Sequence, residues 1–71
     1  MKARIIARDE DGGAEVYRGE HDIAVIPHVG WLLPVVVIPG YRAPIVEQCA
    51  LVADGASAIV EVRCRAGRVA P

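Results

Sequence analysis

Turn-forming residues interrupt this chain every few residues, and this spacing limits the folds open to it more than any other feature. The signals are Asp11-Gly12-Gly13, Gly19, Pro27, Gly30, Pro34, Pro39-Gly40, Pro44 and Asp54-Gly55. Proline and glycine end or weaken helices, so long helices have little room between these positions. Short strands joined by turns fit the spacing better.

The composition favours the same conclusion. The sequence holds eleven Val and seven Ile against three Leu and no Phe. β-Branched side chains are restricted at χ1 and pack well on a pleated surface, so they favour strands. With 54% apolar and 24% charged residues, the chain has enough apolar surface for a packed core. We therefore predict that residues 1–71 form one small all-β domain.

Three strands are indicated by alternating patterns at the two ends of the chain. From Ala58 to Arg65, apolar residues alternate with charged ones, the period of a half-buried strand. Near the start, residues 2–8 and 14–18 read as a hairpin around Gly12-Gly13, which can supply the positive φ of a tight turn.

A fourth strand is predicted over Leu32 to Ile38, an unbroken apolar run. Such a run is typical of a strand covered on both faces, or of one with an exposed apolar side. Pro34 cannot donate to a ladder, so its end of the strand should lie at an edge or bulge. With the segment that follows it, the prediction is a small barrel or sandwich of about five short antiparallel strands.

Residues 44–53 allow two interpretations. As a strand, they pair through Asp54-Gly55 with the last strand, with Leu51 opposite Ala58 and Cys49 opposite Val60; Glu47 then needs a bulge or local exposure. If the segment forms a helix, Pro44 lies in its first turn, and the domain is then α+β. We favour the hairpin, because Asp-Gly between apolar runs is a strong turn signal and no capping side chain precedes Pro44.

Groups able to carry out catalysis are few. The hydroxyls are Ser57, Tyr17 and Tyr41, the imidazoles are His21 and His28, and the thiols are Cys49 and Cys64. A nucleophile, a base and an orienting group must converge in an active site, which is rare in so short a chain. No close-paired Cys or His spacing indicates a metal site. We predict a protein that is not an enzyme and has no cofactor or metal.

The two cysteines are expected to stay reduced. In the predicted hairpin they lie on one face but roughly 13 Å apart along the strands, beyond the reach of a disulfide. We expect no signal peptide, because Met1 to Ala7 lacks an apolar stretch. The apolar region from Ile23 to Pro39 is too short and too broken by proline to span a bilayer. The predicted location is therefore the cytoplasm.

Four arginines form a candidate nucleic-acid site. Small barrels often place their first and last strands side by side, which would align Arg4 and Arg8 with Arg63 and Arg65. Guanidinium groups on one face can bind phosphates. The other interpretation is a charged solvent face that protects the sheet from aggregation.

A second candidate surface is apolar and surrounds the valine run. Its residues are Trp31, Leu33, Val35, Val37 and Tyr41. Aromatic side chains in loops beside an apolar strand are typical anchors of protein contacts. A sheet of five strands covers only one face of the run, so the sequence also predicts a homo-oligomer, in its simplest form a two-fold dimer.

Residues 26–65, which begin with the segment Ile26-Pro27-His28-Val29-Gly30-Trp31, resemble short phage-encoded β proteins of unassigned role. The resemblance implies a small β-barrel accessory protein of a phage or mobile element, acting in the host cytoplasm. The function predicted is a protein-interaction module that binds and inhibits or modulates a host protein. Nucleic-acid binding and a self-assembling structural subunit are the alternatives.

Overall fold

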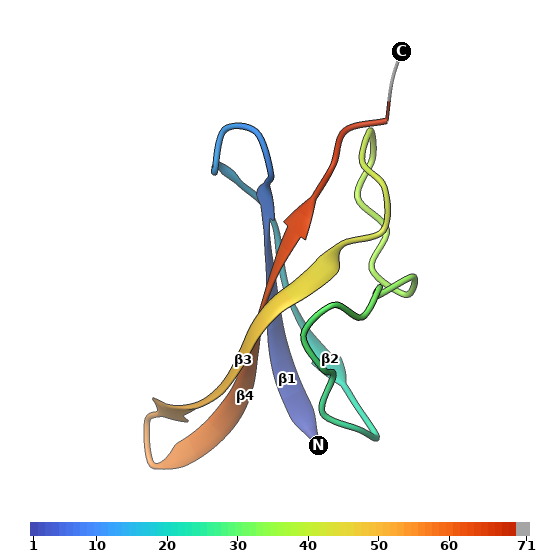
Figure 1. Ribbon diagram of the computed structural model, residues 1–71. Helices are drawn as coiled ribbons and strands as arrows, with labels where there is room; N and C mark the ends of the chain where they lie inside the picture. The colour runs from blue at the N-terminus through green and yellow to red at the C-terminus, as the bar shows by residue number, and fades with distance from the viewer. Residues whose placement is uncertain (70–71) are drawn as a thin grey trace.

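The computed structural model describes residues 1–69, which form four strands of a single open sheet and no helix (Figure 1). The strands are β1 (Lys2–Asp9), β2 (Glu15–Asp22), β3 (Ile45–Asp54) and β4 (Ser57–Ala66). Their order across the sheet is β2-β1-β4-β3. The all-β class is therefore confirmed, whereas the predicted five strands and closed barrel are not found.

The sheet joins two hairpins through its central strands. The β1–β2 and β3–β4 pairs are antiparallel, whereas β1 and β4 run parallel. The sheet is therefore mixed and not wholly antiparallel as predicted. Placement of the first and last strands side by side is confirmed, with Arg4 opposite Glu61 and Arg8 opposite Arg65.

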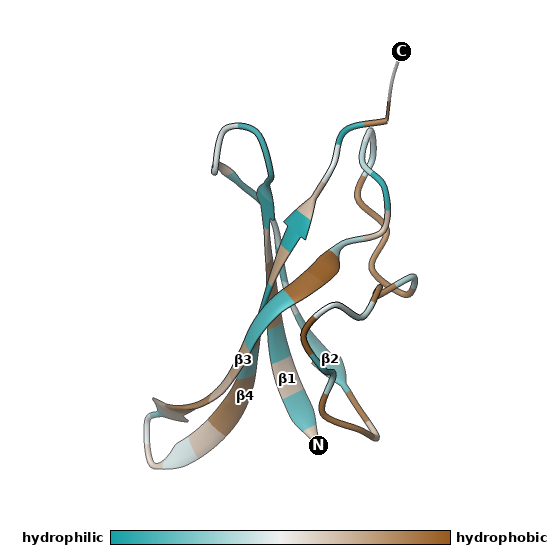
Figure 2. Cartoon of the chain, in the orientation of Figure 1, coloured by the Kyte–Doolittle hydropathy of each residue, from teal (hydrophilic) through white to brown (hydrophobic). Residues whose placement is uncertain are grey.

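The hydrophobic core lies on one face of this sheet. Its strand residues come from alternate positions, so that Ile5, Val46 and Val62 are nearly or fully buried. The long connection between β2 and β3, residues 23–44, passes over this face and adds Val36 and Ile38 to the core. Much of the connection is apolar, as Figure 2 shows. It serves as the second layer that a helix supplies in many small domains.

The prediction of a strand over Leu32 to Ile38 is wrong. Only Leu32 makes an isolated bridge, to Ile45. One turn brings the Val36 N–H to the Leu33 carbonyl at 3.1 Å, and another brings the Tyr41 N–H to the Ile38 carbonyl at 3.0 Å. Prolines at these turns remove donors and bend the chain, so the stretch between them is too short for a ladder.

The hairpin interpretation of residues 45–53 is confirmed, and the helix alternative is wrong. Residues 45–54 pair with β4, and the ladder shifts register between Val46 and Gln48. This irregularity is at Glu47, where the sequence predicted a bulge or local exposure. The bulge turns the Glu47 side chain toward the arginines of the outer face, where it meets Arg8.

The predicted register of this hairpin is wrong by two residues. Asp54 pairs with Ser57, so the two loop residues are Gly55 and Ala56, one position later than predicted. Leu51 consequently lies opposite Val60, and Cys49 lies opposite Val62. Gly55 has φ +65°, which suits the first loop position of a type II′ turn.

Candidate functional site

The connection between β2 and β3 presents an apolar surface to solvent on the side away from the sheet. No Asp, Glu, Lys or Arg occurs between Asp22 and Arg42. We call this the connection surface, and its large exposed side chains are Val25, Ile26, Val29, Trp31, Leu32, Val35 and Val37. Contiguous exposed apolar patches are uncommon on monomeric proteins and mark sites of interaction.

The valine run has two sides because the chain is extended between its two turns. Val36 and Ile38 are 2% and 6% exposed and pack on the sheet. Val35 and Val37 alternate with them and are 76% and 79% exposed. The sheet therefore fixes the backbone that displays the two outward valines.

Trp31 is held at the edge of this surface by backbone contacts with β3. Its carbonyl accepts the N–H of Val46 at 2.9 Å, and the Gly30 N–H donates to the Val46 carbonyl at 2.8 Å. Gly30 has φ +93°, a conformation that L side chains rarely adopt. The indole ring stacks at a tilt on His28, with the ring centroids 4.8 Å apart. Trp31 as a whole is still 46% exposed, which leaves it available to a partner.

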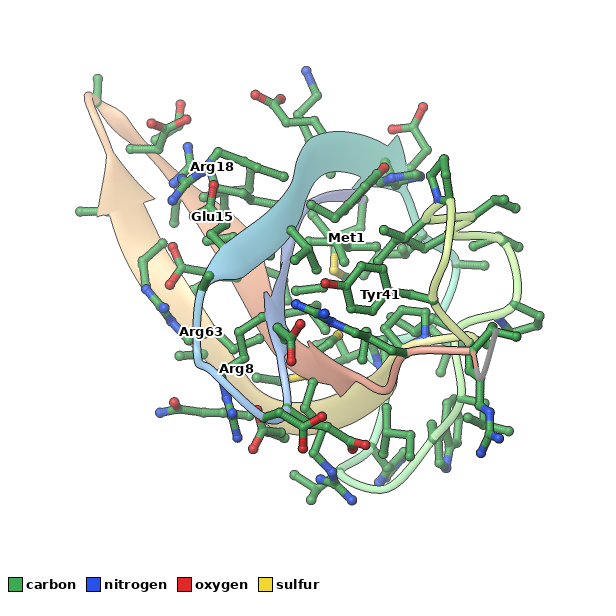
Figure 3. All side chains as sticks on the ribbon, turned by 90° about the horizontal axis from the view of Figure 1, so that it is seen from above. Met1, Arg8, Glu15, Arg18, Tyr41 and Arg63 are labelled. Carbon is green, nitrogen blue, oxygen red and sulfur yellow. The ribbon has the colours of Figure 1, made fainter. Side chains whose placement is uncertain are left out.

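Leu33 and Tyr41, the other two predicted contact residues, lie closer to the core. Both are partly buried and pack against the core cluster. Figure 3 shows Tyr41 on the concave side of the sheet, with Arg63 outside it. The Tyr41 hydroxyl donates a 2.7 Å hydrogen bond to Oδ2 of Asp9. The structure thus brings Trp31, Val35 and Val37 to the exposed surface and gives Leu33 and Tyr41 packing roles.

Asp9 is 2% exposed and is the buried charged residue among residues 1–69; its role was not identified from the sequence. Its Oδ2 atom also accepts a 2.8 Å bond from Arg68 Nε, and Oδ1 accepts the Asp11 N–H at 2.8 Å. The hydrogen bonds from Tyr41, Asp11 and Arg68 lower the Asp9 pKa far below its ordinary value. One carboxylate therefore ties β1 to the connection and to the chain after β4. No local spacing in the sequence indicates this link.

The opposite face of the sheet is charged, but three of its four predicted arginines, Arg4, Arg8 and Arg63, are paired with carboxylates. Arg4 lies 3.4 Å from Asp54 and 3.6 Å from Glu61, and Arg63 lies 2.9 Å from Glu61. Arg65, the fourth predicted phosphate ligand, is opposite Ile45 and Arg8 on its neighbouring strands. The predicted adjacency of the two strands is found, with Arg8 opposite Arg65, but Arg4 lies opposite Glu61 and Arg63 lies opposite Ile6. The face therefore carries both signs of charge.

A shallow hollow of about 480 Å³ lies on this charged face. Its lining residues are Ile6, Arg8, Glu47, Gln48, Arg63 and Cys64. Arg8 makes a two-point contact with Glu47, with Nε–Oε1 and Nη2–Oε2 distances of 2.9 and 2.8 Å. These bonds lower the Glu47 pKa, so the carboxylate stays ionised and remains paired with the Arg8 guanidinium. The hollow therefore offers a phosphate little free positive charge.

The chemically reactive side chains do not converge. Tyr17 and His21 bond to each other on β2, while the Cys49 thiol donates to the Pro27 carbonyl at 3.0 Å. Cys64 is buried in the core, and both cysteines are free. Within residues 1–69 no group of His, Cys, Asp or Glu side chains is arranged to hold a metal ion. Over the same residues, no helix long and apolar enough to cross a membrane is found.

Searches against protein-family models, curated proteins and solved structures returned no match to this chain. The functional assignment therefore depends on the surfaces described above.

Proposed function

We propose that this protein is a non-enzymatic interaction module that binds another protein through the connection surface. The observation that supports the proposal most directly is the contrast between the two sides of one short segment. Val36 is 2% exposed and Val37 is 79% exposed, although they are neighbours in the chain. Val36 packs in the core and stabilises the isolated domain, whereas the exposed Val37 side chain adds no packing to it.

The chemistry of the connection surface indicates an apolar partner surface of low charge. An ionic partner would gain nothing from a surface without charged side chains, and its own charges would lose water on docking. Trp31 combines a large apolar ring with an indole N–H, a composition common among residues that dominate binding energy. The Pro34 and Pro39-Gly40 turns limit the freedom lost on binding, because they fix the backbone beforehand.

The resemblance of residues 26–65 to phage-encoded β proteins extends this proposal to the biological setting. A phage or mobile-element accessory protein that binds a host factor would inhibit or modulate that factor by covering its surface. The proposed setting is the host cytoplasm.

The test is affinity capture from a bacterial lysate with the wild-type chain and two matched variants. Val35→Asp places a charge on the connection surface, while Arg63→Ser changes an exposed side chain on the opposite face. We expect one set of captured proteins to be retained by wild type and Arg63→Ser, to be lost with Val35→Asp, and to persist in high salt. Equal capture by wild type and Val35→Asp would contradict the proposal.

Nucleic-acid binding through Arg4, Arg8, Arg63 and Arg65 remains a prediction with less support. Three of these side chains form ion pairs, with guanidinium nitrogens within 3.6 Å of a carboxylate oxygen. Phosphate binding weakens steeply with salt, so the salt dependence of the capture experiment also separates the two functions.

A further inference from the structure

The open sheet has two outer strands, and their sequences differ in charge. The outer strand β2 reads Glu-Val-Tyr-Arg-Gly-Glu-His-Asp and carries four charged residues, Glu15, Arg18, Glu20 and Asp22. The outer strand β3 carries no charge from Gln48 to Ala53. Charged side chains are a common means of protecting a sheet edge from pairing with another strand. β2 is protected in this way, whereas this stretch of β3 is not.

The first part of the β3 edge is covered by the connection. The Val46 N–H and carbonyl bond to Trp31 and Gly30, and the Pro44 carbonyl accepts the Leu33 N–H at 2.9 Å. Beyond the bulge, residues 48–54 make no backbone hydrogen bonds within the described part of the chain other than those to β4. The free edge is therefore residues 48–54.

The ladder alternation identifies which backbone groups on this edge are free. Asp54 and Ser57 flank a two-residue loop and form a hydrogen-bonded pair, after which the pairs alternate along an antiparallel ladder. The N–H and C=O groups of Cys49, Leu51 and Ala53 consequently point away from β4. They form a row of donors and acceptors to which a further strand can bond.

An apolar surface accompanies these free backbone groups. A hollow of about 190 Å³ is lined by Ile26, Cys49, Ala50, Leu51 and Val60. Leu51 is 73% exposed, although its cross-strand neighbour Val60 is buried. Figure 1 shows the β3–β4 hairpin projecting past the end of β1, with β3 as the outer strand on the side of β4 away from β1. A strand added here would find both hydrogen bonds and an apolar contact.

We propose that the free edge of β3 pairs with the same edge of a second copy, antiparallel and about a two-fold axis at Leu51. In this register Cys49 lies opposite Ala53 of the second copy, and the hydrogen-bonding groups of both edges face each other. The two four-stranded sheets join into one continuous sheet. Leu51 of each copy lies beside its mate and adds apolar cover to both hollows.

Two observations favour a second copy over an unrelated strand. The free stretch, residues 48–54, is centred on Leu51, so a two-fold pairing uses all of it and stops before the connection blocks residues 44–46. The pairing brings no like charges together, because the only charged residue in the stretch, Asp54, lies opposite the Gln48 amide of the other copy. That amide can donate to the carboxylate.

This proposal centres on the edge of β3, which shares Ile26 with the connection surface, and it goes beyond the proposed function. The dimer predicted from the sequence uses the outward side of Leu32 to Ile38, whose inward side packs on its own sheet; that contact is a separate prediction from the pairing proposed at β3. Edge pairing at β3 leaves Val35 and Val37 free for another protein.

Sedimentation equilibrium over a range from low to hundreds of micromolar tests the dimer. We expect the wild-type chain to approach twice the monomer mass. Leu51→Lys places two like charges side by side at the two-fold axis and should halve the mass with an unchanged circular dichroism spectrum. The matched control Val37→Lys adds the same charge at an exposed valine of the connection surface, and it should remain dimeric. A wild-type monomer at hundreds of micromolar, or a dimer lost with Val37→Lys and kept with Leu51→Lys, overturns the proposal.

Hydrogen exchange of the wild-type chain gives a second test that needs no variant. The amides of Cys49, Leu51 and Ala53 should exchange several-fold more slowly at high than at low protein concentration. The Val37 amide serves as the internal reference and should not change. If the three β3 amides exchange at a rate independent of concentration while the mass doubles, the contact lies elsewhere and the proposal fails.

Discussion

The phenol of Tyr41, in the connection, donates a 2.7 Å hydrogen bond to the carboxylate of Asp9, the last residue of β1. Asp9 is 2% exposed, and Arg68 Nε bonds to the same oxygen at 2.8 Å. Three separate segments therefore converge on one ionised side chain. The connection is fastened to the sheet at this point as well as at Trp31.

This arrangement predicts a specific dependence of stability on pH. The folded-state pKa of Asp9 is depressed by the hydrogen bonds from Tyr41, Asp11 and Arg68. A depressed carboxyl pKa stabilises the fold fully above the unfolded value near ~3.9, and that contribution is lost as pH falls through the folded value. We expect Asp9→Asn to lower the unfolding midpoint by several degrees at pH 7. The difference from wild type should shrink below pH ~4.

Thermal unfolding followed by circular dichroism from neutral to acidic pH measures this effect. Asp11→Asn is the matched control, because the Asp11 backbone N–H donates to Asp9 but its own side chain is exposed. The control should unfold near the wild-type midpoint at neutral pH. An Asp9→Asn midpoint equal to wild type at pH 7 would show that the cluster does not stabilise the fold.

The turn between β3 and β4 leads to a second prediction. Gly55 has φ +65°, and within residues 1–69 no atom beyond its chain neighbours lies within 4 Å of the position that a Cβ would take, so the cost of a side chain there is conformational and not steric. Gly55→Val should destabilise the domain by roughly 1–2 kcal/mol or more. Gly12→Val is the control, because Gly12 has equal space and no positive φ. Urea unfolding of both variants measures the difference, and equal losses would exclude backbone strain at Gly55.

The strands at the chain ends could be predicted because local patterns determine them. Ala3, Ile5 and Ala7 face the core while Arg4 and Arg8 face away, as the alternation indicates. The β3–β4 hairpin followed from Asp54-Gly55, and the Glu47 bulge followed from one carboxylate on an apolar face. The exact register did not follow, because one residue's difference in the loop moves every pair.

The middle of the chain was harder to predict, since its structure depends on distant contacts. Continuous apolar residues from Leu32 to Ile38 are compatible with a buried strand or with an extended cover over a sheet, and local propensity does not distinguish them. The role of Asp9 likewise arises from Tyr41 and Arg68, both far from it in sequence. The structure places Val35 and Val37 on the surface, where contact residues must lie, and their binding role remains a proposal.

The cysteines provide a third prediction. Both thiols are free, so denatured protein should react with two equivalents of a thiol reagent without prior reduction. In the native state, burial raises the Cys64 pKa to about 11, and burial also raises the pKa of the less buried Cys49. Native Cys64 should therefore react slowest. Cys49→Ser should remove the faster native phase, and a single reactive thiol after denaturation would contradict the free state of both side chains.

The adjacent valines Val36 and Val37 of the connection give the sharpest test of how the chain packs beneath the connection surface. Val36→Asp forces a carboxylate into the apolar core at a 2% exposed position, so the cost should be several kcal/mol and the chain should unfold. Val37→Asp changes a side chain that is 79% exposed, and its effect on stability should stay within about 0.5 kcal/mol.

Circular dichroism and urea unfolding of the two valine variants decide the matter. Substituting the same residue type at adjacent positions controls for charge and for β propensity, so only the direction of the side chain differs. If Val36→Asp folds and Val37→Asp unfolds, Val37 and not Val36 is the side chain that packs on the sheet. In that case Val36 would face the solvent, and the proposed binding surface would include Val36 in place of Val37.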